Sequence, residues 1–258
     1  MLVFLKSEIL RRNMNRYDFR RRFDTPGPVV LPVIHVLDAE QAQRNIEVAI
    51  GGGCPGVFLI NHDFEKEKLI PIIQEMRRMF PDYWIGVNFL AVTGKVAFPI
   101  LGALQTKGIQ VDGYWADDAR MDERRAEDDQ PEADEIAAVR KSSGWSGLYI
   151  GGTAFKKQRE VDPTQYAKSA RLATGYMDIV VTSGVATGHA ADVGKIETFR
   201  EHCGDTALGL ASGITPQNAA HYADAVDLFM VATGINFEGD FYNIDPDRLK
   251  HLMHLTQK

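Results

Sequence analysis

The sequence reads IVVTSGVATG at residues 179–188, LGLASGITPQN at residues 208–218 and LFMVATGIN at residues 228–236. Each stretch is a short apolar run that breaks into a turn of small residues containing a Ser-Gly or Thr-Gly pair. A buried strand that ends in this way exposes backbone N–H groups and hydroxyls, which suit a phosphate or another anion. Three such units at roughly 25-residue spacing predict the end of a (β/α)8 barrel, with a site at the carboxyl ends of its strands.

The rest of the chain continues the alternation of apolar strands and helices. We expect five earlier strands at residues 29–37, 57–60, 84–89, 111–115 and 147–150. Helical spacing of apolar residues predicts helices at residues 39–50, 66–80, 96–106, 132–141, 163–173, 192–203, 216–222 and 246–255. Eight strand–helix pairs favour a single (β/α)8 TIM barrel over an open sheet, and no Gly-x-Gly-x-x-Gly follows an early strand.

Length and composition fit one globular domain. The chain has 258 residues, of which 45% are apolar, and its net charge of −6 argues against generic nucleic-acid binding. Only two cysteines are present, and no apolar stretch approaches the roughly 20 residues of a membrane span. We therefore expect a cytoplasmic protein with no membrane span.

The N-terminal segment differs in charge from the rest of the chain. We assign residues 29–258 to the barrel and residues 1–28 to an N-terminal arm or helix, which is basic because residues 1–25 hold seven Lys or Arg against three Asp or Glu. Phe4, Ile9 and Leu10 suit packing against the barrel or a partner subunit, but a solvated arm is the interpretation we favour. Barrels of this size often pair, so we expect a homo-oligomer.

The turns after the last two strands are the predicted phosphate site. Ser212-Gly213 and Thr233-Gly234 follow strands seven and eight, where this fold usually binds phosphate. Thr215 can cap the following helix, with Pro216 in its first position, so that the positive end of the helix dipole faces the same loop. The alternative is that both pairs are only tight turns. Neither loop supplies a Lys or Arg, so backbone donors would do most of the binding.

The turn after strand six is longer and looks suited to closing over a substrate. Its candidate binding residues are Thr182, Ser183, Gly184, Thr187 and Gly188. His189, just behind them, can move protons near neutral pH, although a lone loop histidine is more often simply solvent-exposed.

Polar residues at the ends of the first three strands are the candidate catalytic groups: His35, His62, Asp63 and Asn88. His62 or Asp63 can act as acid or base, and Asn88 can hold a substrate oxygen. His35 lies in an apolar strand, so a satisfied interior histidine is the competing interpretation. Together with Asp117 these groups could bind a divalent cation, but no tight ligand spacing is present, and we predict no metal site. The cofactor is otherwise unknown.

The sequence resembles the BtpA/SgcQ family of barrel proteins. The resemblance rests on the order of seven motifs, which are IHVL at 34–37, INHD at 60–63, GVNFL at 86–90, VTSGVATG at 181–188, ASGITPQN at 211–218, VATGIN at 231–236 and NIDPDRL at 243–249. It implies the barrel fold and a site on the same rim. One family member is linked to photosystem I accumulation, and others are encoded beside sugar-metabolism genes.

The chain departs from the family in two places. Strand five reads LYIGGT at 148–153 where the family tends to have a polar Asp-Val-His-Val-Lys type of strand, and an acidic run at residues 117–129 replaces the segment after strand four. Residues 117–135 together hold ten acidic residues and three arginines. The acidic run is either a solvated face or a mobile lid. These departures make a divergent substrate or a loss of catalysis plausible.

Three hypotheses for function follow. The first is an enzyme acting on a small phosphorylated metabolite, such as a sugar phosphate or nucleotide, by lyase, isomerase or phosphoribosyl-transfer chemistry; the lack of a strand-end Lys disfavours a Schiff-base aldolase. The second is a non-catalytic assembly or regulatory factor that uses the acidic run or the arm as its partner surface. The third is a metal-dependent hydrolase using His35, His62, Asp63 and Asp117.

Overall fold

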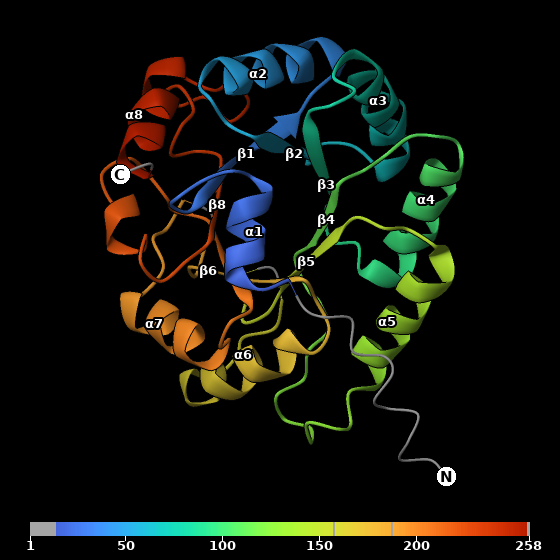
Figure 1. The fold of residues 1–258 in the computed structure, drawn as a ribbon, viewed down its shortest axis with the longest axis vertical. Helices are drawn as coiled ribbons and strands as arrows, with labels where there is room; N and C mark the ends of the chain where they lie inside the picture. Colours follow the sequence, from blue (N-terminus) through green and yellow to red (C-terminus); the bar gives the residue numbers. More distant parts are fainter. Residues whose placement is uncertain (1–13, 157, 187, 257–258) are drawn as a thin grey trace.

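The chain folds into a closed barrel of eight parallel strands surrounded by helices (Figure 1). The computed structural model describes residues 14–156, 158–186 and 188–256. The strands pair in sequence order and β8 closes on β1. They are β1 (Val29–Val36), β2 (Gly56–Asn61), β3 (Trp84–Phe89), β4 (Gly113–Ala116), β5 (Leu148–Gly152), β6 (Ile179–Ser183), β7 (Ala207–Ala211) and β8 (Leu228–Val231). The predicted TIM barrel is confirmed.

Helices that follow the strands form the outer ring. They are α2 (Ala39–Gly51), α3 (Lys66–Met79), α4 (Gly94–Thr106), α5 (Pro131–Ser143), α6 (Tyr166–Thr174), α7 (Val193–His202) and α8 (Pro246–Thr256), with the 3-10 turns η1 (Pro163–Gln165) and η2 (Ala219–His221). A further short helix, α1 (Arg16–Arg22), precedes β1. Asp38 caps α2 as expected, because its side chain accepts a hydrogen bond from the N–H of Gln41 at 2.8 Å. Within the described ranges, no helix has the length and apolar character needed to cross a membrane.

The helix predicted at residues 216–222 is wrong. Only the short turn η2 forms between β7 and β8, where the N–H groups of His221 and Tyr222 bond to carbonyls three residues earlier, as in a 3-10 turn. The side chain of Asn218 fixes the preceding loop, since its Oδ1 accepts from the N–H of Thr215 at 2.8 Å and its Nδ2 donates to the carbonyl of Gly213 at 2.7 Å. The expected cap at Thr215 and the helix dipole aimed at the Ser212-Gly213 turn are therefore both absent from this described segment.

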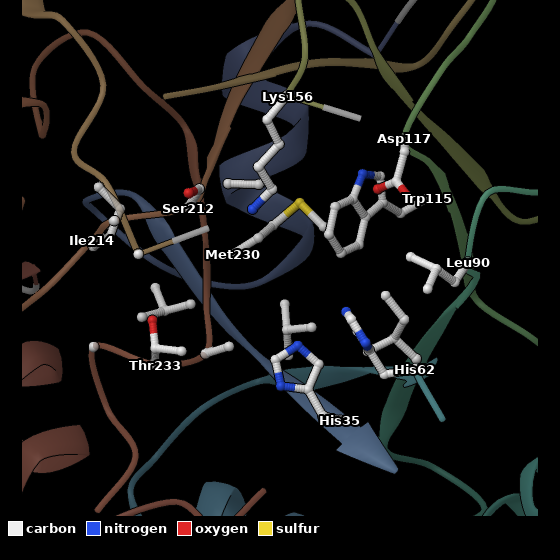
Figure 2. Close-up of a pocket in the computed structure, with 18 residues that line it drawn as sticks. His35, His62, Leu90, Trp115, Asp117, Lys156, Ser212, Ile214, Met230 and Thr233 are labelled. Carbon is white, nitrogen blue, oxygen red and sulfur yellow. The ribbon is translucent and has the colours of Figure 1, made fainter. Parts of the chain in front are cut away.

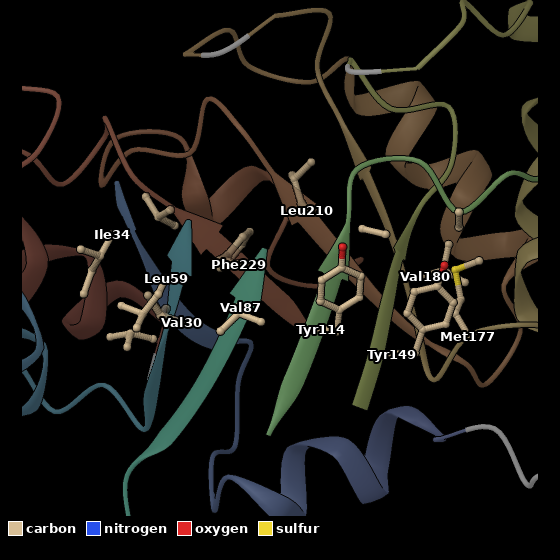
Figure 3. Close-up of a cluster of buried hydrophobic side chains, with 14 of the residues drawn as sticks. Val30, Ile34, Leu59, Val87, Tyr114, Tyr149, Met177, Val180, Leu210 and Phe229 are labelled. Carbon is tan, nitrogen blue, oxygen red and sulfur yellow. The ribbon is translucent and has the colours of Figure 1, made fainter. Parts of the chain in front are cut away.

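Side chains alternate along each strand between two cores. In β1 the side chains of Val29, Leu31 and Val33 belong to the core inside the barrel, whereas Val30 and Ile34 pack in the layer between strands and helices (Figure 3). This alternation is the ordinary consequence of the two-residue period of a strand. It fixes which residues beyond each strand end can reach the opening at the top of the barrel.

The short helix α1 covers the opposite end of the barrel (Figure 1). Phe19 is fully buried in the inner core and packs edge-on against Phe23, which contacts Trp84. Arg16 and Arg20 bind the buried carboxylate of Asp227 at 3.1 and 2.9 Å, and Arg200 binds it at 3.0 Å. The interpretation as a solvated basic arm is therefore wrong for α1. Phe4, Ile9 and Leu10 lie outside the described residues.

Candidate functional site

A pocket opens at the carboxyl ends of the strands, above the inner core (Figure 2). Its cavity volume is about 50 Å³, which is small for a ligand site, and the cavity opens to solvent at its mouth. Its polar and glycine lining comes from the ends of β1, β2 and β4 and from the loops after β5 to β8: His35, His62, Asp117, Lys156, Gly188, Ser212, Gly213, Thr233 and Gly234. Most of the predicted site residues thus meet in one place.

His35 stands at the bottom of the pocket with its ring fixed on one side. Its side chain continues the inward series of β1, and its ring stacks on Phe241 with centroids 3.8 Å apart. Nδ1 lies 2.9 Å from the carbonyl oxygen of Phe241; because that oxygen can only accept, Nδ1 carries a proton. Burial lowers the pKa of His35 to about 4, and this effect exceeds the opposing one of the Phe241 hydrogen bond. The ring is therefore neutral at pH 7, and Nε2 carries a lone pair.

His62 and Asp63 follow β2 but are placed differently. His62 lines the pocket, and its ring meets those of His35 and Phe241 edge-on. Asp63 is outside the lining, and one of its carboxylate oxygens accepts a hydrogen bond from the hydroxyl of Tyr242 at 2.9 Å. The two-residue period separates them, since His62 continues the inward series of Phe58 and Ile60 whereas Asp63 does not.

Asn88 acts beneath the pocket surface. Its side chain is fully buried, it is not part of the lining, and its Nδ2 donates to Oδ1 of Asp117 at 3.2 Å. Asp117 is itself 5% exposed and does line the pocket. Asn88 thus orients the carboxylate of Asp117 and does not itself border the pocket.

The turns after β7 and β8 form the opposite side of the pocket from His62 and Asp117 (Figure 2). Gly213 and Gly234 are required by close packing, because a Cβ at either would clash with the backbone of His189 or Ile214. Ser212 has a φ of 95°, and its hydroxyl donates to the carbonyl of Ala186 at 2.7 Å. Gly213 and Gly234 both line the pocket, and within the described ranges their N–H groups donate no hydrogen bond.

The turn after β6 contributes less than its sequence predicts. Gly188 lines the pocket, but Thr182, Ser183 and Gly184 do not, and Thr187 lies outside the described residues. Thr182 falls on the outward face of β6 and donates to the carbonyl of Ala154 at 3.2 Å. Ser183 accepts from the N–H of Lys156 at 2.9 Å. Both hydroxyls therefore hold the neighbouring β5 loop.

Lys156 is a pocket residue that sequence reasoning missed. It follows β5 by four residues and enters the pocket from the side opposite His35 (Figure 2). The β5 loop is held by Lys195 of α7, whose Nζ donates to the carbonyls of Ala154 and Ser183 at 2.6 and 2.8 Å. Ala154 has a φ of 46°, a left-handed conformation that turns the loop back over the barrel. The expected lack of a cation at the site is therefore corrected.

The acidic segment after β4 is folded against the β5 loop. Glu123 is 2% exposed and binds Arg159 at 2.5 Å, and Asp122 accepts from the same guanidinium at 3.3 Å. Gln130 closes the segment by donating to the carbonyls of Asp122 and Ala126. Asp122, Glu123 and Gln130 are thus held by the protein and are not part of a solvated face.

The described residues do not favour a metal centre. No group of three or more His, Cys, Asp or Glu side chains in this part of the chain is arranged to hold a metal ion. His35, His62 and Asp117 all line the pocket, yet they do not form such a group, and Asp63 is outside the lining. The metal-dependent hydrolase therefore gains no support from these side chains.

Comparisons with known proteins agree with the fold and with the predicted resemblance. Residues 153–258 match the BtpA family, which confirms that resemblance for this part of the chain. The search of curated proteins found no match. Among solved structures, the tryptophan synthase alpha subunit of Legionella pneumophila is 14% identical with a TM-score of 0.63, over 94% of this chain and 98% of that one.

Two further structures share the barrel at similar distance. The phosphoribosyl anthranilate isomerase of Thermus thermophilus is 12% identical with a TM-score of 0.55, over 88% of this chain and 97% of its own. A native KDPGal structure is 13% identical with a TM-score of 0.58, over 88% and 93%. At these identities the likeness shows the fold alone.

Proposed function

We propose that this chain is a barrel enzyme that acts on a small phosphorylated metabolite in the pocket at the strand carboxyl ends. The phosphate is bound at the turns Ser212-Gly213 and Thr233-Gly234, with Lys156 supplying the positive charge. His35, His62 and Asp117 face the rest of the molecule. Phosphoribosyl anthranilate isomerase, whose name specifies a phosphorylated compound, has the same fold and offers a precedent for such a substrate.

The observation that carries the proposal is the division of one pocket into two chemically different sides. One side offers backbone N–H groups at glycines and the ammonium group of Lys156, both of which favour an anion. The other side offers titratable groups held by Phe241 and Asn88. A substrate fixed by its phosphate on one side would present its reactive carbons to acid–base groups on the other.

The candidate catalytic residues acquire distinct roles in this arrangement. Neutral His35 accepts a proton or hydrogen bond at Nε2, and His62 exchanges protons with the substrate beside it. Asn88 is a positioning residue that holds Asp117. Because Lys156 lines the pocket, a Schiff base is no longer disfavoured by the lack of a lysine, and lyase chemistry stands beside isomerase and phosphoribosyl-transfer chemistry.

Binding of inorganic phosphate tests the proposal without knowledge of the substrate. We expect isothermal titration calorimetry to detect one phosphate per chain. The variant Lys156→Gln should bind between about tenfold and a hundredfold more weakly, since a charge-assisted hydrogen bond contributes roughly 1.5–3 kcal/mol. Ser212→Glu should abolish binding, because it adds a negative charge at the anion side. The control Lys141→Gln removes an exposed lysine of α5 and should bind as the parent does.

The same experiment separates this proposal from the non-catalytic alternative. If the parent protein binds neither phosphate nor any of a panel of phosphorylated metabolites, the phosphate site is refuted. Unchanged affinity in both Lys156→Gln and Ser212→Glu would show that phosphate binds elsewhere. Either result would favour an assembly or regulatory factor.

A further inference from the structure

We infer that the pocket selects a phosphorylated compound whose far end carries hydroxyl groups, and that it rejects one whose far end carries a second acidic group. This inference rests on the proposed function, because it takes the phosphate to lie at the turns after β7 and β8. It goes further by naming the chemistry of the other end of the substrate.

The first support is the hydrogen-bonding polarity of His35. Its Nδ1 proton is committed to the carbonyl of Phe241 at 2.9 Å, and stacking on the Phe241 ring at 3.8 Å resists rotation of the imidazole. Nε2 is the remaining polar atom of the ring. A neutral imidazole with this tautomer can only accept at Nε2, so its ligand partner has to donate.

The surroundings of His35 keep its ring neutral, so that Nε2 remains a hydrogen-bond acceptor. Burial lowers the pKa of His35 most, and the charges of His62 and Lys156 lower it further, whereas the Phe241 hydrogen bond and Asp63 raise it by less. Because burial lowers the pKa to about 4, Nε2 stays an acceptor throughout the neutral range. A hydroxyl or N–H group of a ligand satisfies it, whereas a carboxylate presents only lone pairs.

The second support is Asp117, which lines the pocket beside Trp115 (Figure 2). The residue is 5% exposed, and its Oδ1 accepts from the amide of Asn88 at 3.2 Å. A carboxylate also accepts hydrogen bonds, and it repels a second anion strongly where water is scarce. His35 in β1 and Asp117 after β4 are therefore both hydrogen-bond acceptors, and both favour a ligand group that donates, such as a hydroxyl.

The donors lie elsewhere in the same pocket. Lys156 and the glycine turns contribute their charge and N–H groups near Ser212 and Thr233, on the side proposed for the phosphate (Figure 2). A compound with a phosphate and hydroxyls matches both sides at once. A compound with a phosphate and a carboxylate leaves His35 without a donor and places like charges together beside Asp117.

Two small probes of nearly equal size test this directly. Glycerol 3-phosphate and 3-phosphoglycerate share a phosphate and a three-carbon chain, and differ by a terminal hydroxymethyl group against a carboxylate. By isothermal titration calorimetry at pH 7 we expect glycerol 3-phosphate to bind at least about tenfold more tightly, which corresponds to roughly 1.4 kcal/mol. Inorganic phosphate, measured in parallel, reports on the anion side alone.

Two variants assign the selectivity to its residues. Asp117→Asn removes the negative charge and should reduce the preference to about threefold or less, which corresponds to roughly 0.7 kcal/mol. His35→Phe removes the acceptor while preserving a ring against Phe241, and should weaken glycerol 3-phosphate more than phosphate. The control Asp118→Asn makes the same change one residue later, outside the pocket lining, and should keep the parent's preference.

The outcomes distinguish this inference from the proposal beneath it. A protein that binds phosphate but binds both probes equally, prefers 3-phosphoglycerate or ignores glycerol 3-phosphate would overturn the inference and leave the phosphate site standing. An unchanged preference in both folded variants would also overturn it. A protein that binds none of the three compounds would refute the proposed function itself.

Discussion

The two ends of the barrel both bury charged groups, but they use them differently. At the end covered by α1, the carboxylate of Asp227 is fully buried and is met by Arg16, Arg20, Arg200 and the N–H of Leu208. At the other end, His35 is held through Nδ1 alone and its second nitrogen borders a pocket. A charge whose partners all come from the protein stabilises the fold, whereas a polar group held from one side retains capacity for a ligand.

Substitution of Asp227, at the end of the barrel covered by α1, should cause the largest loss of stability. Asp227→Ala leaves three guanidinium groups without their shared carboxylate, and loss of one partner from a buried ionic group costs about 3–5 kcal/mol. Urea denaturation measures the loss. The exposed Asp224→Ala, three residues earlier, should cost less than about 0.5 kcal/mol.

This prediction also tests the contrast between the ends. Under conditions where Asp227→Ala stays folded, its phosphate affinity should match that of the parent protein. A loss of stability below about 1 kcal/mol would show that the ionic cluster is not what holds α1. A loss of phosphate affinity in the folded variant would show that the two ends are not independent.

The pH dependence of stability tests the state of His35 at the pocket end of the barrel. The pKa of His35 falls from 6.5 to about 4 on folding because the ring is buried, so the unfolded chain takes up a proton at a higher pH than the native one. The stability contributed by neutral His35 is therefore complete above pH 6.5 and is lost as the pH falls to 4. The full effect is about 3 kcal/mol.

Urea denaturation between pH 7 and pH 4 isolates this effect. His35→Phe should lose less stability than the parent over that interval, because it has no imidazole to protonate. The control His251→Phe changes an exposed histidine of α8 and should follow the parent curve. Parallel curves for the parent and His35→Phe would contradict a neutral buried His35.

Substitution of Lys195, at the pocket end of the barrel, should have the smallest effect of the three, and the effect should be on phosphate affinity. Lys195→Met removes the donors to the carbonyls of Ala154 and Ser183, so the loop that carries Lys156 is less well fixed. Phosphate affinity should fall about threefold to tenfold, equivalent to roughly 0.7–1.4 kcal/mol. Calorimetric titration measures it, with Lys141→Met as the control. Unchanged affinity would show that Lys195 does not position the loop.

The fold was largely predictable because its signals are local. The apolar run of β1 and the cap at Asp38 each specify an element within a few residues, and the repeated strand–helix units specify the barrel. The helix predicted at 216–222 is reduced to a 3-10 turn whose N–H groups at His221 and Tyr222 bond three residues back. So short a segment carries too few apolar positions for its periodicity to separate a helix from a turn.

The site was predictable only in part because it depends on loop paths. The inward period of β1, β2 and β4 would have placed His35, His62 and Asp117 in the pocket, and the period of β6 would have kept Thr182 out of it. No strand period reaches Lys156. Its position requires the left-handed turn at Ala154 and the bonds from Lys195, which come from a helix about forty residues later.

A crystal structure grown with inorganic phosphate tests the proposed site most directly. We predict tetrahedral density at the turns Ser212-Gly213 and Thr233-Gly234, within hydrogen-bond distance of their N–H groups and of Nζ of Lys156. Well-ordered turns with no density between them, in crystals that bind phosphate elsewhere, would contradict the proposal.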